Sequence, residues 1–137
     1  MTTTITIRNA LPELERVHDA ILSFLDGTGA SREFAEEMFL VAEEVLANTI
    51  SYGYADDAGH EIELAQSVEG GVFSMRFTDD GAPYDPLARP DPDLDAPHED
   101  RGVGGLGIHL VRTLTDEATY RREADRNILT VGRRLHP

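Results

Sequence analysis

The N-terminal part of the chain changes its hydrophobic pattern after the first eight residues. Residues 4–8 alternate apolar and polar side chains, which is the period of a strand with one buried face. From Leu14 to Leu25 the apolar residues recur three and four apart, which is the period of an amphipathic helix. Asn9 stands before this helix as a candidate cap, and Gly27 follows it as a stop signal. The pattern predicts a short strand followed by a helix.

A second helical pattern extends from Ser31, a candidate N-cap, to about Ser51. Glu44 and Asn48 are four residues apart, so on a helix they project from one face, at the edge of the apolar stripe. Glu43 points toward the opposite edge. Such a polar pair is commonly a solvated helix flank. Alternatively it faces a pocket, where the Asn oxygen suits Mg²⁺ and the Glu carboxylate can act as a general base.

Four later segments have the two-residue period of strands, and they form two pairs. Residues 61–68 and 72–78 are joined by a glycine-containing hairpin turn, and residues 118–122 and 128–135 lie on either side of the sequence EADRN. The element order predicts an α+β fold, a two-layer α/β sandwich whose mostly antiparallel sheet is covered on one face by helices. The length is that of a single domain over residues 1–137.

The segment between the two strand pairs, residues 79–101, fits neither period. It holds five of the seven prolines and eight acidic residues. Loops of this length inside a compact domain are usually functional or disordered. Four glycines then fall between residues 102 and 107, ahead of a short helical pattern over residues 108–114. The glycines predict either a flexible hinge or a backbone that approaches phosphate groups at a helix N-terminus.

A second candidate site begins this long segment, where Asp79-Asp80-Gly81 ends a predicted strand. An isolated Asp-x-Gly is usually only a turn. A carboxylate held at this position could instead accept a hydrogen bond from an exocyclic amine such as adenine N6. Gly81 would then allow the backbone to pass close to the base.

Composition narrows the partners and the chemistry. The chain has 26 acidic and 12 basic residues, a formal charge of -14, and every basic residue is arginine. This surface repels nucleic acid and acidic membranes, so we expect neither as a partner. The absence of lysine excludes a Walker-type phosphate loop, and the absence of cysteine excludes disulfides. No apolar run approaches the ~20 residues of a membrane span, and we expect a cytoplasmic protein.

The order of these signals is more specific than any one of them. A helix with Glu-x-x-x-Asn, a strand ending in Asp-x-Gly, a long loop and a glycine-rich helix start together resemble the GHKL (Bergerat-fold) ATP-binding superfamily. Within it, the tail GLGIHLVRTLTDEATYRREADRNILTV resembles the RsbW-type anti-sigma-factor serine kinases. The resemblance covers essentially the whole chain. It implies the Bergerat ATP-binding fold, ATP and Mg²⁺ as ligands, and serine kinase activity.

The resemblance also implies roles for individual residues. Glu44 would be the catalytic base that accepts the serine proton, and Asn48 would bind Mg²⁺. Asp79 would hold adenine, with Gly81 beside the ring. Arg101 would be the cation near the terminal phosphate. The phosphate loop and the hinge of a lid formed by the proline-rich segment would contain the remaining nucleotide-binding positions: Gly104, Gly105, Leu106 and Gly107.

The partners are implied in the same way. Such kinases phosphorylate a small anti-sigma-factor antagonist on serine, sequester a sigma factor or a similar regulator, and are usually homodimers. Two other functions stay open. One is a regulatory module that binds ATP without phosphorylating a partner. The other is a detached histidine-kinase catalytic domain, which the missing His-bearing helix and the short segment between Asn48 and Asp79 disfavour.

Overall fold

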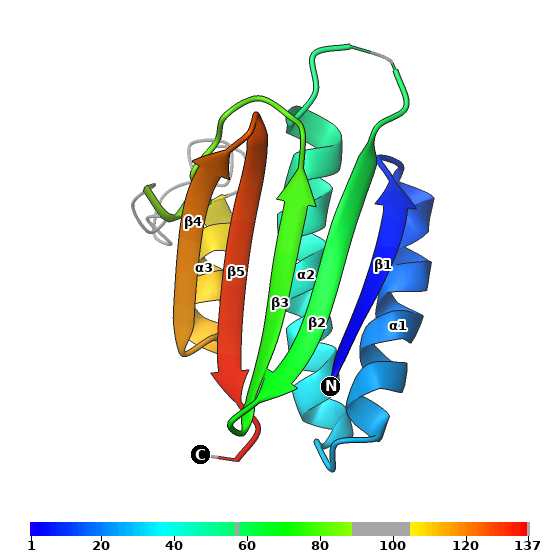
Figure 1. Ribbon diagram of the computed structural model, residues 1–137, viewed down its shortest axis with the longest axis vertical. Helices are drawn as coiled ribbons and strands as arrows, with labels where there is room; N and C mark the ends of the chain where they lie inside the picture. Colours follow the sequence, from blue (N-terminus) through cyan, green and yellow to red (C-terminus); the bar gives the residue numbers. More distant parts are fainter. Residues whose placement is uncertain (57, 89–104, 137) are drawn as a thin grey trace.

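Alternating apolar residues build a five-stranded sheet in the computed structural model, which describes residues 1–56, 58–88 and 105–136. The strands lie in the order β1-β2-β3-β5-β4, and each neighbouring pair is antiparallel (Figure 1). Their bounds are β1 (Thr2–Arg8), β2 (Glu61–Glu69), β3 (Val72–Asp79), β4 (Glu117–Glu123) and β5 (Arg126–Arg134).

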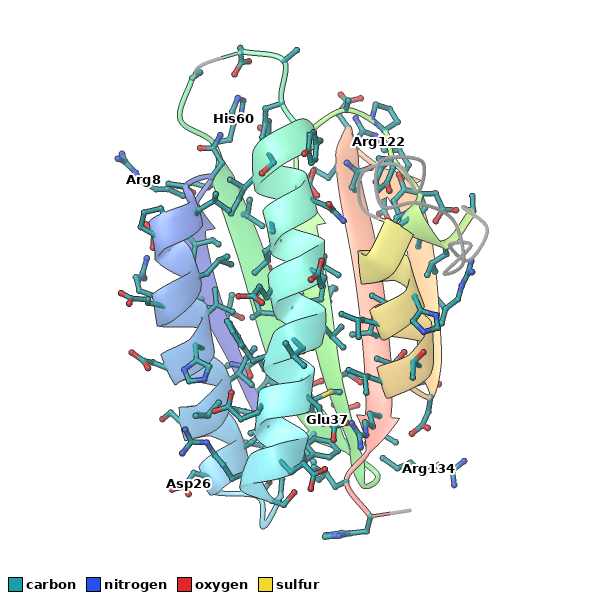
Figure 2. All side chains as sticks on the ribbon, turned by 180° about the vertical axis from the view of Figure 1, so that it is seen from behind. Arg8, Asp26, Glu37, His60, Arg122 and Arg134 are labelled. Carbon is teal, nitrogen blue, oxygen red and sulfur yellow. The ribbon has the colours of Figure 1, made fainter. Side chains whose placement is uncertain are left out.

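Three helices pack against one face of this sheet: α1 (Leu14–Asp26), α2 (Arg32–Tyr52) and α3 (Gly105–Leu114). Figure 2, seen from behind the view of Figure 1, shows the helices in front of the strands. The two views together confirm the predicted α+β sandwich, with helices on one side of an antiparallel sheet. No helix in the part of the chain that the structure describes is long and apolar enough to cross a membrane.

The core lies between the helices and the inward face of the sheet. Every second residue of β3 from Phe73 to Asp79 is buried, because alternate side chains of a strand point to the same face. The helices contribute one face each, as their periodicity predicts. The largest fully buried side chains are Phe73, Ile21, Leu25, Met38, Leu46, Ile62, Leu64 and Met75. Burying a side chain of this size contributes roughly 1.5–3 kcal/mol.

Both predicted hairpins are present, and both use two-residue turns. Gly70 and Gly71 have φ of +58° and +78° between β2 and β3, a conformation that glycine adopts without steric cost. Between β4 and β5 the same left-handed conformation falls on Ala124 and Asp125, with φ of 52° and 61°. The strands therefore extend further into the predicted EADRN connection than alternation alone suggested, because only two of its five residues form the turn.

Helix caps show one confirmed prediction and one error. The Ser31 hydroxyl accepts a hydrogen bond from the Phe34 N–H at 3.0 Å and caps α2. Asn9 does not cap the first helix. Its side-chain oxygen instead accepts the backbone N–H of His60 at 2.9 Å, so it joins the end of β1 to the start of β2. The chain enters α1 through a short 3₁₀ turn, η1 (Leu11–Glu13), which has no side-chain cap.

Two further boundaries differ from the sequence expectation. The proline-rich segment includes a 3₁₀ turn, η2 (Pro86–Ala88), where no helical period was predicted. Helix α3 begins at Gly105, so Gly105 and Gly107 lie inside its first turn rather than ahead of it. The N–H groups of the first helical turn have no intrahelical partners, so fewer helix hydrogen bonds depend on the residues there and glycine is tolerated.

Candidate functional site

The C-terminal half of α2 and the adjoining ends of β3 and β5 surround a cavity of about 370 Å³. Glu44 and Asn48 line it from α2, Asp79 from the end of β3 and Asn127 from the start of β5. Val111 of α3 and several apolar side chains of the sheet complete the wall. A largely apolar cleft with a few convergent polar groups is the usual form of a small-molecule site.

Asp79 faces this cavity because of its place in the strand pattern. It continues the inward series Phe73, Met75 and Phe77, so its carboxyl group points to the helix side and is only 8% exposed. Its Oδ1 accepts hydrogen bonds from the Gly81 N–H at 2.8 Å and from the Asn127 side chain at 3.0 Å. Its Oδ2 has no hydrogen-bond partner among the described residues and stays available as an acceptor.

Gly81 sits at a close approach between two backbone segments. A Cβ on Gly81 would lie 2.6 Å from the Gly53 carbonyl oxygen and 3.0 Å from Asp79 Oδ1. The same carbonyl of Gly53, at the C-terminus of α2, accepts the Ala82 N–H at 2.9 Å. The loop after β3 is therefore bound directly to the end of α2, and only glycine fits at position 81 without a backbone shift.

The structure places Glu44 and Asn48 on one side of α2, as their four-residue spacing indicated. Both are half-buried and line the cavity from one side of α2, whereas Glu43 does not line it. Burial raises the pKa of the Glu44 carboxyl above its ordinary value, and the negative charge of Glu43 raises it further. A carboxylate with a raised pKa is a stronger proton acceptor than an ordinary surface glutamate, which suits a general base.

Asn127 is the site residue that sequence reasoning missed. It was assigned to the turn before residue 128, whereas β5 begins at Arg126 and pairs Asn127 with Asp79. The signal was available, because Asn127, Leu129 and Val131 share the inward period of a strand. Extending the alternation by one residue would have turned the Asn127 side chain inward, whereas its place beside Asp79 follows from the pairing of β3 with β5.

Some predicted positions lie beyond what the structure describes. Arg101 and Gly104 fall outside the described residues. Gly105, Leu106 and Gly107 form the first turn of α3, which contacts α2 across the cavity side of the sheet. Their roles toward a nucleotide stay predictions.

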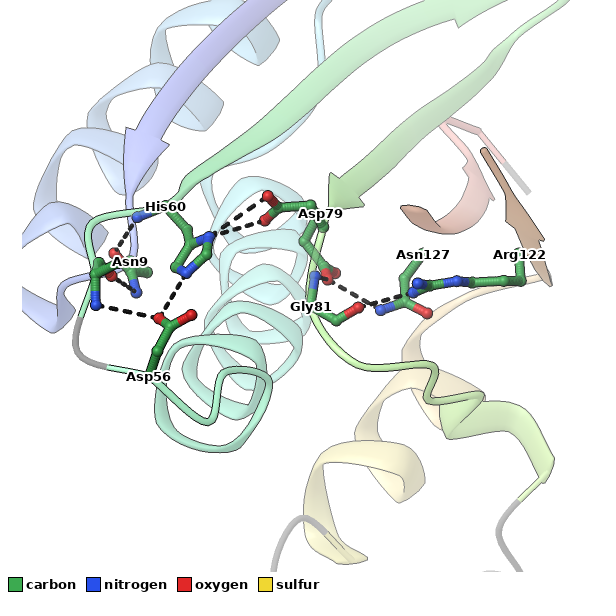
Figure 3. A network of polar contacts seen from close by, with 9 residues as sticks. Asn9, Asp56, His60, Asp79, Gly81, Arg122 and Asn127 are labelled. Atoms are coloured by element: carbon green, nitrogen blue, oxygen red, sulfur yellow. Dashed lines mark hydrogen bonds and ion pairs between the residues drawn. The ribbon is translucent and has the colours of Figure 1, made fainter. Parts of the chain in front are cut away.

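A second polar cluster lies beside the cavity, on the other side of the end of α2 (Figure 3). His60 contacts the Asp56 carboxylate at 2.8 Å through Nε2 and the Asp80 carboxylate at 3.3 Å through Nδ1. Hydrogen bonds to these two acids raise the pKa of His60, Asp56 contributing most. The Tyr54 ring stacks on the imidazole, with centroids 4.1 Å apart. Burial raises the pKa of Tyr54, so its hydroxyl stays neutral.

Two curated relatives match part of this chain. The serine/threonine-protein kinase BtrW of Bordetella bronchiseptica is 30% identical over 92 residues, which is 67% of this chain. The serine-protein kinase RsbW of Listeria monocytogenes is 25% identical over 93 residues, which is 65% of this chain. The matched region spans 65% and 59% of the two relatives' own lengths, which is less than two thirds of either.

Two solved structures share the fold. The crystal structure of the RsbU and RsbW domains of Rv1364c from Mycobacterium tuberculosis superposes with a TM-score of 0.71 at 18% identity, over 98% of this chain and 32% of that one. The Acinetobacter baumannii histidine kinase AdeS superposes with a TM-score of 0.50 at 14% identity, over 97% of this chain and 68% of that one. At these identities the likeness concerns the fold.

The sequence model of the histidine kinase-like ATPase domain matches residues 7–133, nearly the whole chain. Its match includes every element that borders the cavity, from α2 to β5. The chain belongs to the histidine kinase-like ATPase domain family.

Proposed function

We propose that this protein is an ATP- and Mg²⁺-dependent serine kinase of a partner-switching system. One observation carries the proposal: Glu44 and Asn48 of α2 and Asp79 at the end of β3 line the same cavity. The relatives that match the chain are named as serine or serine/threonine kinases, which supports the reaction class.

The cavity offers one group for each part of the nucleotide. The open Oδ2 of Asp79 is an acceptor for the exocyclic amine of adenine. Gly81 is not among the residues that line the cavity, so its part would be indirect: it lets the loop after β3 pass close to Asp79 and to the end of α2. Helix α3 begins with glycines, and the free N–H groups of a helix start suit the phosphate tail. Asn48 offers a neutral oxygen about one helical turn along α2 from Glu44, on the same face.

The residues also fit Mg²⁺. Within the described ranges no three His, Asp or Glu side chains form a metal cluster. Mg²⁺ bound with a nucleotide normally takes one or two protein oxygens and completes its shell with phosphates and water. Asn48 would be the protein ligand, and the ion would offset negative charge on the phosphates.

Glu44 has the position and the basicity for the transfer step. Its carboxylate accepts the proton of a serine hydroxyl on the antagonist while the serine oxygen bonds to the γ-phosphorus. The bond between that phosphorus and the β-γ bridging oxygen breaks, and ADP leaves with the bond's electron pair. The substrate would be a small anti-sigma-factor antagonist. The partner held between transfers would be a sigma factor or a similar regulator, bound by a homodimer in the cytoplasm.

The test compares Glu44→Ala with a matched variant, Glu43→Ala. Calorimetry with ATP and Mg²⁺ measures binding, and transfer of labelled γ-phosphate to a small anti-sigma-factor antagonist protein measures reaction. We expect Glu44→Ala to bind ATP like the wild type and to lose transfer by at least about 100-fold. Glu43→Ala, on the same turn but outside the cavity lining, should retain transfer.

Three results would change the proposal. Transfer that survives in Glu44→Ala would remove this residue from the base role. ATP binding without transfer to any antagonist would favour the regulatory binding module. A well-folded protein that binds no adenine nucleotide would end the proposal altogether.

A further inference from the structure

The amide of Asn127 is fully engaged by the protein itself. Its nitrogen donates to Asp79 Oδ1 at 3.0 Å and to the Ala82 carbonyl at 2.9 Å. Its oxygen accepts the Tyr84 N–H at 3.2 Å and the Tyr120 hydroxyl at 2.5 Å. Carboxylate and carbonyl can only accept, and a backbone N–H can only donate, so the partners fix which end of the amide is which. Asn127 has no donor or acceptor left for a ligand.

This amide controls the orientation of the Asp79 carboxyl group. Asp79 Oδ1 is held by two donors, the Asn127 side chain and the Gly81 N–H, which come from different segments (Figure 3). Rotation of the carboxyl group would break both hydrogen bonds. Since both side chains are less than 9% exposed, water cannot readily replace those donors. Oδ2 is thereby kept as the oxygen that faces the cavity.

The surrounding loop is held by the same strand pair. Arg122 of β4, the cross-strand partner of Asn127, donates to the Gly81 carbonyl at 2.8 Å. The backbone of residues 81 to 84 is therefore held by side chains from β5 and β4, which lie on the same side of β3. The fold fixes the orientation of the Asp79 carboxyl group before any ligand binds. This lowers the conformational entropy that is lost on binding.

We propose that Asn127 is the positioning residue that makes the site selective for a base with an exocyclic amine, by holding Asp79 with Oδ2 toward the cavity. The inference rests on the proposed function, because it assumes that an adenine nucleotide occupies the cavity. Asn127 does not touch the base. It acts through Asp79, so its loss should weaken recognition of the amine more than recognition of the rest of the nucleotide.

The experiment compares ATP with purine riboside triphosphate, which lacks the 6-amino group, by calorimetry with Mg²⁺. Asn127→Leu keeps nearly the size of the side chain but removes the donor that faces Asp79. We expect ATP affinity to fall about tenfold or more, because Asp79 is no longer held with Oδ2 toward the cavity and its hydrogen bond to the 6-amino group is lost. Affinity for the analogue should fall less than about threefold, since that nucleotide makes no use of the oriented acceptor.

Two additional variants separate positioning from folding. Asn127→Ser keeps a polar side chain that is too short to reach Asp79, so it tests the inference if the leucine variant does not fold. Val131→Ala creates a comparable defect in a buried position of the same strand, away from the cavity lining. It should leave the ratio of the two affinities at the wild-type value. Circular dichroism establishes that each variant is folded.

The possible results are distinct. Selective loss of ATP affinity supports the inference. Equal losses for both nucleotides, or no loss for either, would overturn it and reduce Asn127 to a structural role. A wild-type protein that binds both nucleotides equally would overturn it as well, because Asp79 would then not recognise the amine. Wild-type protein that binds neither nucleotide would contradict the proposed function itself.

Discussion

The two ends of α2 meet the sheet in opposite ways. Near its N-terminus, the Phe34 ring centroid lies 6.2 Å from that of Phe73 of β3, and the Phe24 ring centroid of α1 lies 5.9 Å from it. Near its C-terminus, the sheet instead presents Asp79 and Asn127, and a cavity separates them from the helix. Figure 2 shows Glu37 close to the aromatic end, and His60 and Arg122 at the end with the cavity.

The two ends of the contact between α2 and the sheet therefore have different tasks: one stabilises the fold and the other leaves a site for a ligand. At the aromatic end, large rings fill the space between helix and sheet, and such dense apolar packing stabilises the folded state. At the cavity end, the backbone is held by hydrogen bonds that are already satisfied, and the space that remains is free for a ligand. A domain that must keep an open site needs its closed region to supply the stability.

The largest expected effect comes from opening the aromatic end. Phe73→Ala should lower the free energy of unfolding by about 3–5 kcal/mol, because the side chain is 1% exposed and two other rings pack on it. That is a large share of the ~5–15 kcal/mol of a typical domain. Urea denaturation measures it, with Leu11→Ala, at a site 51% exposed, as the control. Similar losses for both variants would contradict the assignment of stability to this end.

The second largest effect on stability is expected from adding a methyl group at Gly81, beside the cavity. Gly81→Ala should cost about 1–3 kcal/mol of stability and also weaken ATP binding, because the new methyl group must displace Gly53 or Asp79. Gly59→Ala is the matched control, since a Cβ there meets nothing within 4 Å. Calorimetry and urea denaturation of both variants provide the comparison. Unchanged ATP affinity in Gly81→Ala would show that the close approach does not shape the site.

A smaller effect is expected where Arg133 of β5 closes the aromatic end. Its guanidinium pairs with Glu37 at 3.0 Å and lies 4.8 Å from the centroid of the Phe34 ring. Both charged side chains are partly exposed, so Arg133→Gln should cost only about 0.5–1 kcal/mol. ATP affinity should not change, because the cavity is at the other end of α2. A double-mutant cycle with Glu37→Gln isolates the ion pair, and a change in affinity would contradict the separation of the two ends.

The smallest effect concerns the pH dependence of the reaction at the cavity end. Glu44 acts as a base only when it is deprotonated, so transfer should fall as the pH drops through its pKa. Burial and the charge of Glu43 raise that pKa above the ordinary 4.5, so the acid limb should lie above that pH. Glu43→Ala removes the smaller cause and should move the limb downward by less than about one pH unit. A pH profile of transfer at saturating ATP measures it, and an upward movement would contradict the assignment of the limb to Glu44.

Periodicity predicted the fold well because each element has one buried face. The strand and helix periods gave the element order, the hairpins and the Ser31 cap, and the four-residue spacing of Glu44 and Asn48 placed both on the cavity side. Local patterns could not assign Asn9 correctly, since its partner His60 is distant in sequence. The same limit applies to Asn127, whose importance depends on a cross-strand neighbour. The spacing of residues also does not show which ligand the site residues bind, because that depends on the chemistry of their side chains and not on their period.

The hydrogen bond from the Ala82 amide to the Gly53 carbonyl couples the loop after β3 to the last turn of α2. Opening of this contact sets how fast the Ala82 amide proton exchanges with deuterated solvent. A molecule seated in the cavity would hold both segments at once, so exchange at Ala82 should slow in proportion to occupancy. That single amide gives a residue-level reporter of binding for any compound, including one that is never chemically turned over.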